Sequence, residues 1–159
     1  MTTILAMKKI KTIYCDRQLN VGSKKMTIPA KIFPIKHHDG TKELLAGCGN
    51  WDKVKAFVAW YEAKAKHGEV ITDEEKPFHV LEPPNIEGAS FITITDKGEM
   101  WYMVDNGQWA EICDDYMAMG SGGDFATGAI AAGASPKQAM KIAHQFDAMT
   151  GSKVMKKKL

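Results

Sequence analysis

The order of the predicted elements indicates an α+β domain in which sheets and helices form separate layers. Strand-like segments come first, then one amphipathic helical segment, then a clear hairpin, and finally two more helical segments. Because strands and helices do not alternate one by one, this order argues against a series of βαβ units. The chain has 159 residues, the length of one domain, so we expect residues 1–159 to fold as a single unit.

In the first half of the chain, short apolar runs of strand length are separated by turn residues. The predicted strands are residues 3–7, 12–15, 25–27, 30–35 and 43–46. The segments 25–27 and 30–35 are expected to pair with each other, with a break at Pro29, and Pro34 favours an edge position. The last of these strands runs into Gly47-Cys48-Gly49.

A helical period replaces the strand pattern at residues 52–66. Apolar side chains recur at i, i+3, i+4, i+7 and i+11, the charged side chains mostly take the other face, and His67-Gly68 ends the pattern. The residues of the apolar face are Val54, Phe57, Val58, Tyr61 and Ala65. Residues 69–88, which contain three prolines, are expected to form a long surface connection without a helix.

The second half begins with the clearest hairpin in the sequence, residues 91–94 and 100–104 around Asp96-Lys97-Gly98. Two further short strands are predicted at 109–113 and 116–119, and a helix rich in Ala and Gly opens at Gly123. The last helix begins after Ser135, which has the residue type of an N-cap. Pro136 at the first helical position and Gln138 at the capping-box position strengthen that boundary.

The composition excludes several classes of protein. Of all residues, 45% are hydrophobic and 25% charged, and 21 Lys+Arg against 19 Asp+Glu give a net charge of +2. This balance does not predict nucleic acid or an anionic membrane as a main partner. The sequence has no spanning apolar run and no signal-peptide pattern, so we expect a cytoplasmic protein. Lys156 to Lys158 are expected to form a frayed, solvated tail.

Neither the cysteines nor the histidines predict a metal site. Cys15, Cys48 and Cys113 are widely separated, with no CxxC pair and no Cys/His spacing suited to zinc. They are expected to be buried, reduced thiols. The adjacent histidines of His37-His38-Asp39 lie in a predicted turn and are expected to be exposed to solvent.

Thr2 is the first candidate for chemistry. A residue as small as Thr lets the initiator Met1 be removed, which would leave Thr2 with a hydroxyl and a free α-amine. An α-amine titrates near pH ~8, so a sizeable fraction is neutral at physiological pH and can accept the hydroxyl proton. Threonine with its own amine is a recognised nucleophile–base pair. Many proteins begin with Met-Thr, however, so this feature alone carries little weight.

Three further positions could complete such a site, and each also has a purely structural explanation. Asp16 and Lys31, at the ends of two predicted strands, could form a pair in which the carboxylate holds an ammonium near the nucleophile, or a surface charge pair. The glycine-rich residues 120–124 could bring backbone N–H groups close to another group, or simply make a tight turn. Residues 147–151 could cap the last helix.

Taken together and in order, these positions resemble the proteasome β-subunit superfamily of N-terminal nucleophile hydrolases, and most closely its HslV-type members. The segment TTILA from Thr2 is similar to the mature start of those proteins, and Asp16 and Lys31 fall where the family has its aspartate and catalytic lysine. The segment MGSGG at 119–123 is similar to the family's GSGG turn, and DAMTG at 147–151 matches its Asp-x-x-Ser-Gly element, with Thr in place of Ser.

The resemblance implies a four-layer αββα sandwich. One helix layer should be reduced, because residues 69–88 stand where the family has a second long helix, and residues 153–159 should form a short tail in place of a closing strand. It also implies a threonine-type endopeptidase in which Thr2 attacks the peptide carbonyl and its amine is the base. Lys31 would tune the site, Asp16 would orient Lys31, and Ser121 and Asp147 would support the amine, with Thr150 and Gly151 beside them. The N–H of Gly47 or Gly49 would form the oxyanion hole.

The resemblance further implies a homo-oligomeric ring that cleaves peptides or unfolded proteins and works with an ATPase unfoldase. No cofactor is expected with certainty, and a monovalent cation near Thr150 and Gly151 is the one candidate. Two other classes of function stay open at this stage: a catalytically silent proteasome-like scaffold or assembly protein, and an unrelated α+β domain that binds an anion at its glycine turn.

Overall fold

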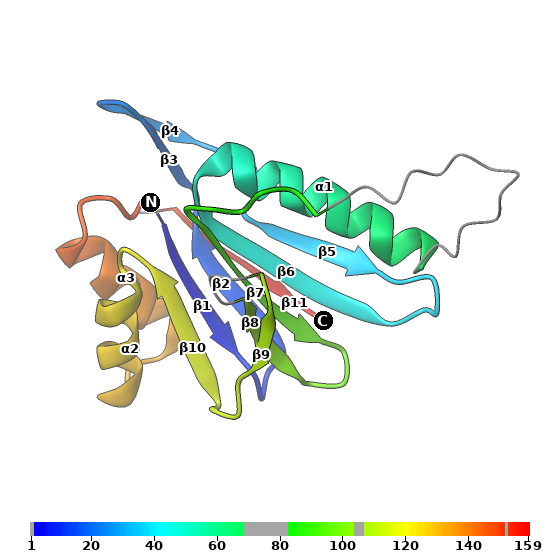
Figure 1. Ribbon diagram of the computed structural model, residues 1–159. Helices are drawn as coiled ribbons and strands as arrows, with labels where there is room; N and C mark the ends of the chain where they lie inside the picture. Colours follow the sequence, from blue (N-terminus) through cyan, green and yellow to red (C-terminus); the bar gives the residue numbers. More distant parts are fainter. Residues whose placement is uncertain (1, 69–82, 104–106, 152) are drawn as a thin grey trace, which may run out of the picture.

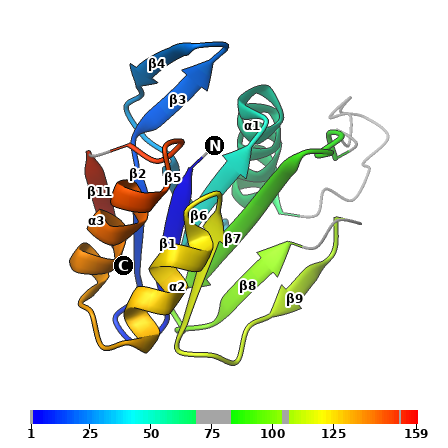
Figure 2. The same ribbon diagram turned by 90° about the vertical axis from the view of Figure 1, so that its left-hand side faces the viewer.

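Two antiparallel sheets pack face to face between layers of helices in the computed structural model, which describes residues 2–68, 83–103, 107–151 and 153–159 (Figure 1). One sheet has the strand order β10-β1-β2-β11 and the other the order β5-β6-β7-β8-β9. Helices α2 and α3 cover the outer face of the first sheet, and α1 lies on the outer face of the second (Figures 1 and 2). The expected four-layer αββα architecture is confirmed. Within the described residues, α1 is the only helix on its side.

The four-stranded sheet is built around the start of the chain. Strand β1 (Thr3–Met7) pairs on one side with β2 (Thr12–Asp16) and on the other with β10 (Tyr116–Gly120). Strand β11 (Val154–Lys158) pairs with the free side of β2, from Val154 opposite Asp16 to Lys158 opposite Thr12. The prediction of a frayed lysine tail is therefore wrong, as is that of a short tail in place of a closing strand. The open edge of β2 supplies the partner, and lysines are common on such an edge strand.

The five-stranded sheet contains the strands β5 (Ile32–Lys36), β6 (Lys42–Gly49), β7 (Ala89–Thr95), β8 (Met100–Met103) and β9 (Trp109–Glu111). Strand β5 is an edge strand, which fits Pro34. The predicted pairing of 25–27 with 30–35 is wrong. Strand β4 (Lys24–Thr27) instead pairs with β3 (Gln18–Val21) in a separate hairpin, which extends beyond the sheets near the N-terminus (Figure 2).

The helices follow their sequence signals closely. Helix α1 (Trp51–His67) begins after Asn50, whose side chain accepts the N–H groups of Asp52 and Lys53. Helix α2 (Gly123–Ala131) begins directly after the glycine-rich turn. Helix α3 (Pro136–Phe146) has the predicted capping box between Ser135 and Gln138. The N-terminus lies at one end of the first sheet, and both the start of α2 and the loop after α3 lie at that same end (Figure 2).

Strand β1 illustrates how the layers are formed. Ile4 and Ala6 face the second sheet and belong to the core between the sheets, whereas Leu5 points the other way and packs with Met140 of α3. Ile4, Leu5 and Ala6 are all fully buried, as expected for successive residues of a strand that is covered on both faces. A third apolar cluster lies between α1 and the second sheet and is centred on Phe57 and Phe91, whose ring centroids are 4.2 Å apart.

Other expectations are corrected or fall outside the described residues. Cys15 and Cys48 are buried as expected, but Cys113 is exposed, because it follows the short strand β9 in a surface turn. Residues 69–82 of the predicted connection, and Val104 of the predicted hairpin, lie outside the described residues. Among the described helices, none combines the length and apolarity that crossing a bilayer requires.

In the turn with two histidines, His38 is exposed as expected, whereas His37 is partly buried. The His37 Nε2 atom lies 2.7 Å from a carboxylate oxygen of Glu43, a side chain that is only 3% exposed. The hydroxyl of Thr93 donates to the other oxygen of Glu43 at 2.6 Å. His37 therefore satisfies a buried carboxylate at the edge of the second sheet. No cluster of three or more His, Cys, Asp or Glu side chains suited to a metal ion occurs in the described part of the chain.

Candidate active site

Three polar residues from different strands meet at the N-terminal end of β1. Thr2 directly precedes β1, Asp16 is the last residue of β2, and Lys31 immediately precedes β5. All three are almost completely buried, with exposed fractions of 3% for Thr2, 0% for Asp16 and 2% for Lys31. The side-by-side pairing of β1 with β2, and the packing of the second sheet beneath them, bring these separated positions together.

The Lys31 ammonium is surrounded by oxygen atoms. It donates to the Thr2 hydroxyl oxygen and to the backbone carbonyl of Gln18, and its Nζ lies 3.3 and 3.2 Å from the two carboxylate oxygens of Asp16. An ammonium has only donors, and every one of these partners can accept. The arrangement therefore places a positive charge directly at the Thr2 hydroxyl.

Asp16 in turn is held by backbone N–H groups. One carboxylate oxygen accepts from Thr3 N–H at 2.8 Å, and the other accepts from Gln18 N–H at 2.8 Å and from Gly151 N–H at 3.2 Å. A buried carboxylate needs such donors to replace its lost hydration. Asp16 therefore links the first strand, the β3 hairpin and the loop after α3 in one position beneath Thr2.

A second group of hydroxyls lies beside this charged pair. The Ser121 hydroxyl donates to Asp147 Oδ2 at 2.6 Å, and the Thr150 hydroxyl donates to the same oxygen at 2.5 Å. The hydroxyl oxygens of Thr3 and Thr150 are 2.6 Å apart. Because the Thr150 proton is directed to Asp147, the Thr3 hydroxyl donates to Thr150. A chain of hydrogen bonds thus runs from Asp147 to the residue that follows Thr2.

These hydrogen bonds determine how Asp147 titrates. Burial on its own raises the pKa of Asp147, but the hydrogen bonds from Ser121, Thr150 and the Met149 N–H outweigh it and hold the pKa below its ordinary value. A carboxyl whose pKa is depressed on folding stabilises the folded state above its ordinary pKa. That stability is lost as the pH falls through the folded-state value.

We expect the Asp147→Asn variant to lose part of its stability at pH 7 and to be less sensitive to acid than the wild type. Urea unfolding midpoints measured from pH 7 down to pH 3 should converge for the two proteins as Asp147 of the wild type becomes protonated. A Lys137→Ala variant, altered on the exposed face of α3, should follow the wild-type curve. Parallel curves for wild type and Asp147→Asn would contradict the assignment.

The glycine-rich turn is shaped by close contacts with the first residues of the chain. Gly120 has φ +88°, and a Cβ atom there would lie 1.9 Å from the carbonyl oxygen of Thr2. A Cβ on Gly122 would lie 2.0 Å from the Thr3 hydroxyl oxygen. Any larger residue would therefore displace the start of β1. The glycines therefore allow the turn to pack directly against Thr2 and Thr3.

Strand β6 directs a backbone N–H toward the site. In an antiparallel sheet successive N–H groups point to opposite neighbours. The carbonyl of Thr41 accepts from His37 on the β5 side, and that of Lys42 accepts from Asp96 on the β7 side. Odd-numbered residues of β6 therefore face β5, and Gly47 lies just beyond the last β5–β6 pair, Ile32 with Ala46.

Gly47 is accordingly the better placed of the two glycines to offer its N–H near Lys31. Its missing side chain also matters, because a Cβ there would lie 2.8 Å from the Phe91 ring. Gly49 is also an odd-numbered residue of β6, but it has φ +101° and packs against the carbonyl of Gly88. Gly49 therefore allows the chain to turn from β6 into α1.

The contacts of Thr150 and Gly151 compete with a monovalent cation for the same oxygen atoms. The Thr150 carbonyl already accepts a hydrogen bond from His144, and its hydroxyl is engaged with Asp147 and Thr3. Gly151 contributes an N–H, which is a donor and is directed to Asp16. A cation needs several available oxygen ligands, and both Thr150 oxygens already have hydrogen-bond partners.

Two contributions to the site were missed in the sequence. The Gln18 carbonyl accepts from Lys31, and a backbone group has no signature in the residue type. The Thr3 hydroxyl joins the chain that leads to Asp147, although Thr3 reads simply as a strand residue. Burial raises the pKa of the Cys48 thiol, near Gly120, to about 11, which disfavours its reactive thiolate form.

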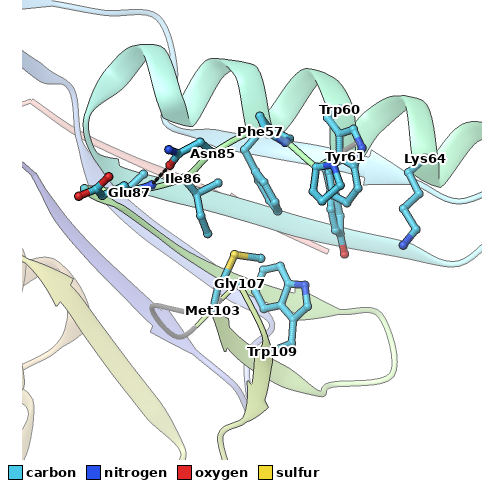
Figure 3. A pocket seen from close by; sticks show the side chains of 14 residues that line it. Phe57, Trp60, Tyr61, Lys64, Asn85, Ile86, Glu87, Met103, Gly107 and Trp109 are labelled. Atoms are coloured by element: carbon cyan, nitrogen blue, oxygen red, sulfur yellow. Dashed lines mark hydrogen bonds between the residues drawn. The ribbon is translucent and has the colours of Figure 1, made fainter. Parts of the chain in front are cut away.

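A cavity of about 610 Å³ lies elsewhere, between α1, the segment that leads into β7, and strands β8 and β9 (Figure 3). Its walls are mainly aromatic and apolar, with Phe57, Trp60, Met103 and Trp109 among them. Lys64 lies at its rim, 5.5 Å from the centre of the Trp60 ring. None of the residues around Thr2 lines this cavity, so the two places are separate.

Comparison with known proteins identifies the fold. No protein-family model and no curated protein sequence matches the chain. Among solved structures, HslV from Trypanosoma brucei is similar over 98% of both chains, with a TM-score of 0.69 and 23% identity. A Gly-1 mutant of Anbu from Hyphomicrobium sp. strain MC1 covers the whole chain and 81% of its own, with a TM-score of 0.77 and 14% identity. BPH from Thiobacillus denitrificans matches 99% of this chain and 97% of its own, with a TM-score of 0.71 and 16% identity. The chain has the proteasome-like N-terminal nucleophile hydrolase fold.

Proposed function

We propose that the chain is a threonine-type endopeptidase subunit whose nucleophile is the hydroxyl of Thr2. The observation that carries the proposal is the contact between the Lys31 ammonium and the Thr2 hydroxyl oxygen, in a site where Asp16 and the Gln18 carbonyl hold the ammonium in place. A nearby positive charge favours the deprotonated hydroxyl, and burial strengthens the effect because water does not screen it.

The proposed first step uses two groups of one residue. Removal of Met1 leaves Thr2 with a free α-amine, which accepts the hydroxyl proton as the oxygen attacks the substrate carbonyl. The Gly47 N–H stabilises the oxyanion of the tetrahedral intermediate. The amine then returns the proton to the leaving nitrogen, the peptide bond breaks, and an ester to Thr2 remains. Water hydrolyses that ester in a second step and restores Thr2.

In this scheme the Lys31 ammonium donates to the Asp16 carboxylate and the Gln18 carbonyl and acts on the Thr2 hydroxyl through its positive charge. Ser121 and Asp147, which are hydrogen-bonded to each other, support the terminal amine. Thr150 connects Thr3 to Asp147 through its hydroxyl. Gly151 completes the support by fixing Asp16.

We further propose that the protein cleaves peptides or unfolded proteins as a cytoplasmic homo-oligomeric ring, with an ATPase unfoldase as its partner. The support is the shared fold: the Anbu complex from Pseudomonas aeruginosa, matched with a TM-score of 0.71 and 10% identity, was solved as a helical assembly. Light scattering of the purified chain should therefore show a large assembly.

Labelling with epoxomicin tests the nucleophile. BPH from Thiobacillus denitrificans was solved in complex with epoxomicin, with a TM-score of 0.64 and 15% identity to this chain. We expect the purified chain to have a mass lower by one methionine and to gain one epoxomicin per chain, at Thr2. A Thr2→Val variant is the matched control and should gain none. Complete retention of Met1, or equal labelling of the variant, would refute the proposed function.

A further inference from the structure

The Thr150–Gly151 peptide bond connects the buried site to an exposed side chain on α3. Its carbonyl oxygen lies 2.8 Å from Nδ1 of His144, and its N–H donates to Asp16 Oδ2 at 3.2 Å. A carbonyl can only accept, so His144 donates its Nδ1 proton. His144 itself is exposed, in the last turn of the helix.

The geometry of a peptide unit makes these two hydrogen bonds dependent on each other. The C=O and N–H of one peptide bond lie in a rigid plane and point to opposite sides when the bond is trans, and the described chain contains no cis bond. This plane therefore spans the distance between His144 and Asp16. A rotation that weakens one hydrogen bond also turns the other group away from its partner.

Thr150 also carries the hydroxyl that contacts Thr3 and Asp147. The loop makes one tight turn, in which the Asp147 carbonyl accepts from Thr150 N–H at 3.1 Å and the Asp147 carboxylate accepts from Met149 N–H at 3.0 Å. Lys25 also donates to the Ala148 carbonyl at 3.2 Å, and the Asn20 side-chain amide contacts the Met149 sulfur at 3.9 Å. None of these contacts involves the Thr150 carbonyl. Ala148 is exposed and Met149 partly so. On its carbonyl side, the Thr150–Gly151 plane is held by the imidazole of His144.

We propose that His144 is a positioning residue: by holding the Thr150 carbonyl, it orients the Gly151 N–H onto Asp16 and thereby the Lys31 ammonium onto Thr2. In this proposal the imidazole donates to the carbonyl oxygen that a cation near Thr150 and Gly151 would use as a ligand, and it takes the place of that cation. This inference rests on the proposed function for its kinetic consequence, but the hydrogen-bond relay can be measured without catalysis.

The test compares His144→Leu with His144→Asn, because the Asn side-chain amide can place an N–H where Nδ1 lies. We expect kcat for a peptide substrate to fall about three- to tenfold in His144→Leu, the worth of one hydrogen bond, with KM unchanged within about twofold. His144→Asn should recover most of the loss. Gln145→Ala, the exposed neighbour on α3, should behave as the wild type.

Hydrogen exchange of the Gly151 amide, followed by NMR, gives a readout independent of activity. It should be about tenfold faster in His144→Leu and close to the wild-type rate in His144→Asn. Replacing KCl by choline chloride should leave the wild-type rate within about twofold. Equal kinetics and equal Gly151 exchange in the wild type and His144→Leu would overturn the proposal, as would a loss of activity in choline chloride. An inactive wild type whose Gly151 amide responds to His144→Leu would refute the proposed function and support the relay.

Discussion

Replacement of Thr2 by valine should abolish peptide hydrolysis, with kcat/KM falling by at least about 10³-fold. Valine has nearly the shape of threonine, so the buried position beside Lys31 stays filled while the hydroxyl is replaced by a methyl group. Valine is also about as small as threonine, so we expect Met1 still to be removed. The variant therefore keeps the amine and lacks only the nucleophile.

Thr2→Ser is the matched variant for this experiment, because it keeps the hydroxyl and loses only the methyl group. It should retain activity within about tenfold of the wild type, reduced because the less hindered side chain samples more rotamers. Both variants should assemble like the wild type in light scattering. Hydrolysis that persists in Thr2→Val would place the nucleophile elsewhere, and an assembled but inactive wild type would favour the scaffold interpretation.

Removal of the Asp16 charge should destabilise the fold more than removal of the Lys31 charge. Asp16 accepts three backbone N–H groups, on both carboxylate oxygens, in addition to the ammonium. In Asp16→Asn the amide NH₂ must face at least one of these donors in either orientation, and the Lys31 ammonium loses its counter-charge. We expect a loss of about 3–5 kcal/mol in the free energy of unfolding.

Lys31→Met fills a similar volume and leaves Asp16 with its three N–H donors. The expected loss is smaller, about 1–2 kcal/mol, because the remaining buried charge is still hydrogen-bonded. Urea unfolding at pH 7 measures both variants. Activity should fall by about 10²-fold or more in each, since each removes or misplaces the charge at the Thr2 hydroxyl. A Lys31→Met variant less stable than Asp16→Asn would mean that the ammonium, and not the carboxylate, organises the site.

Much of the architecture was predictable because its signals are local. The period-two pattern of residues 3–7, the helical period beginning at Val54 and the capping box at Ser135 each express which face of an element is buried or how a helix end is satisfied. The element order then restricted the fold to separated layers. The candidate residues Thr2, Asp16 and Lys31 drew attention through the chemistry of their side chains, but each alone had a structural explanation, and the resemblance to the family joined them into one site.

The errors concern edges and pairings. Lys156 to Lys158 were predicted to form a solvated tail, because the lysines themselves do not indicate the open edge of β2 that they cover. Strand β4 was assigned the wrong partner, because residues 18–21, with which it pairs, were not predicted as a strand. Pairing between distant segments depends on what the rest of the sheet leaves uncovered, and that is not encoded in a window of sequence.

By itself, the sequence determined the layers, the helix limits and the side chains able to perform chemistry at Thr2, because burial patterns, caps and functional groups belong to individual residues. Only the tertiary structure decided how these side chains are held: the Gln18 carbonyl on Lys31, the direction of the Gly47 N–H, and the peptide plane between His144 and Asp16. Those contacts are made by backbone groups, which every residue carries alike, so their partners emerge only when the chain is folded.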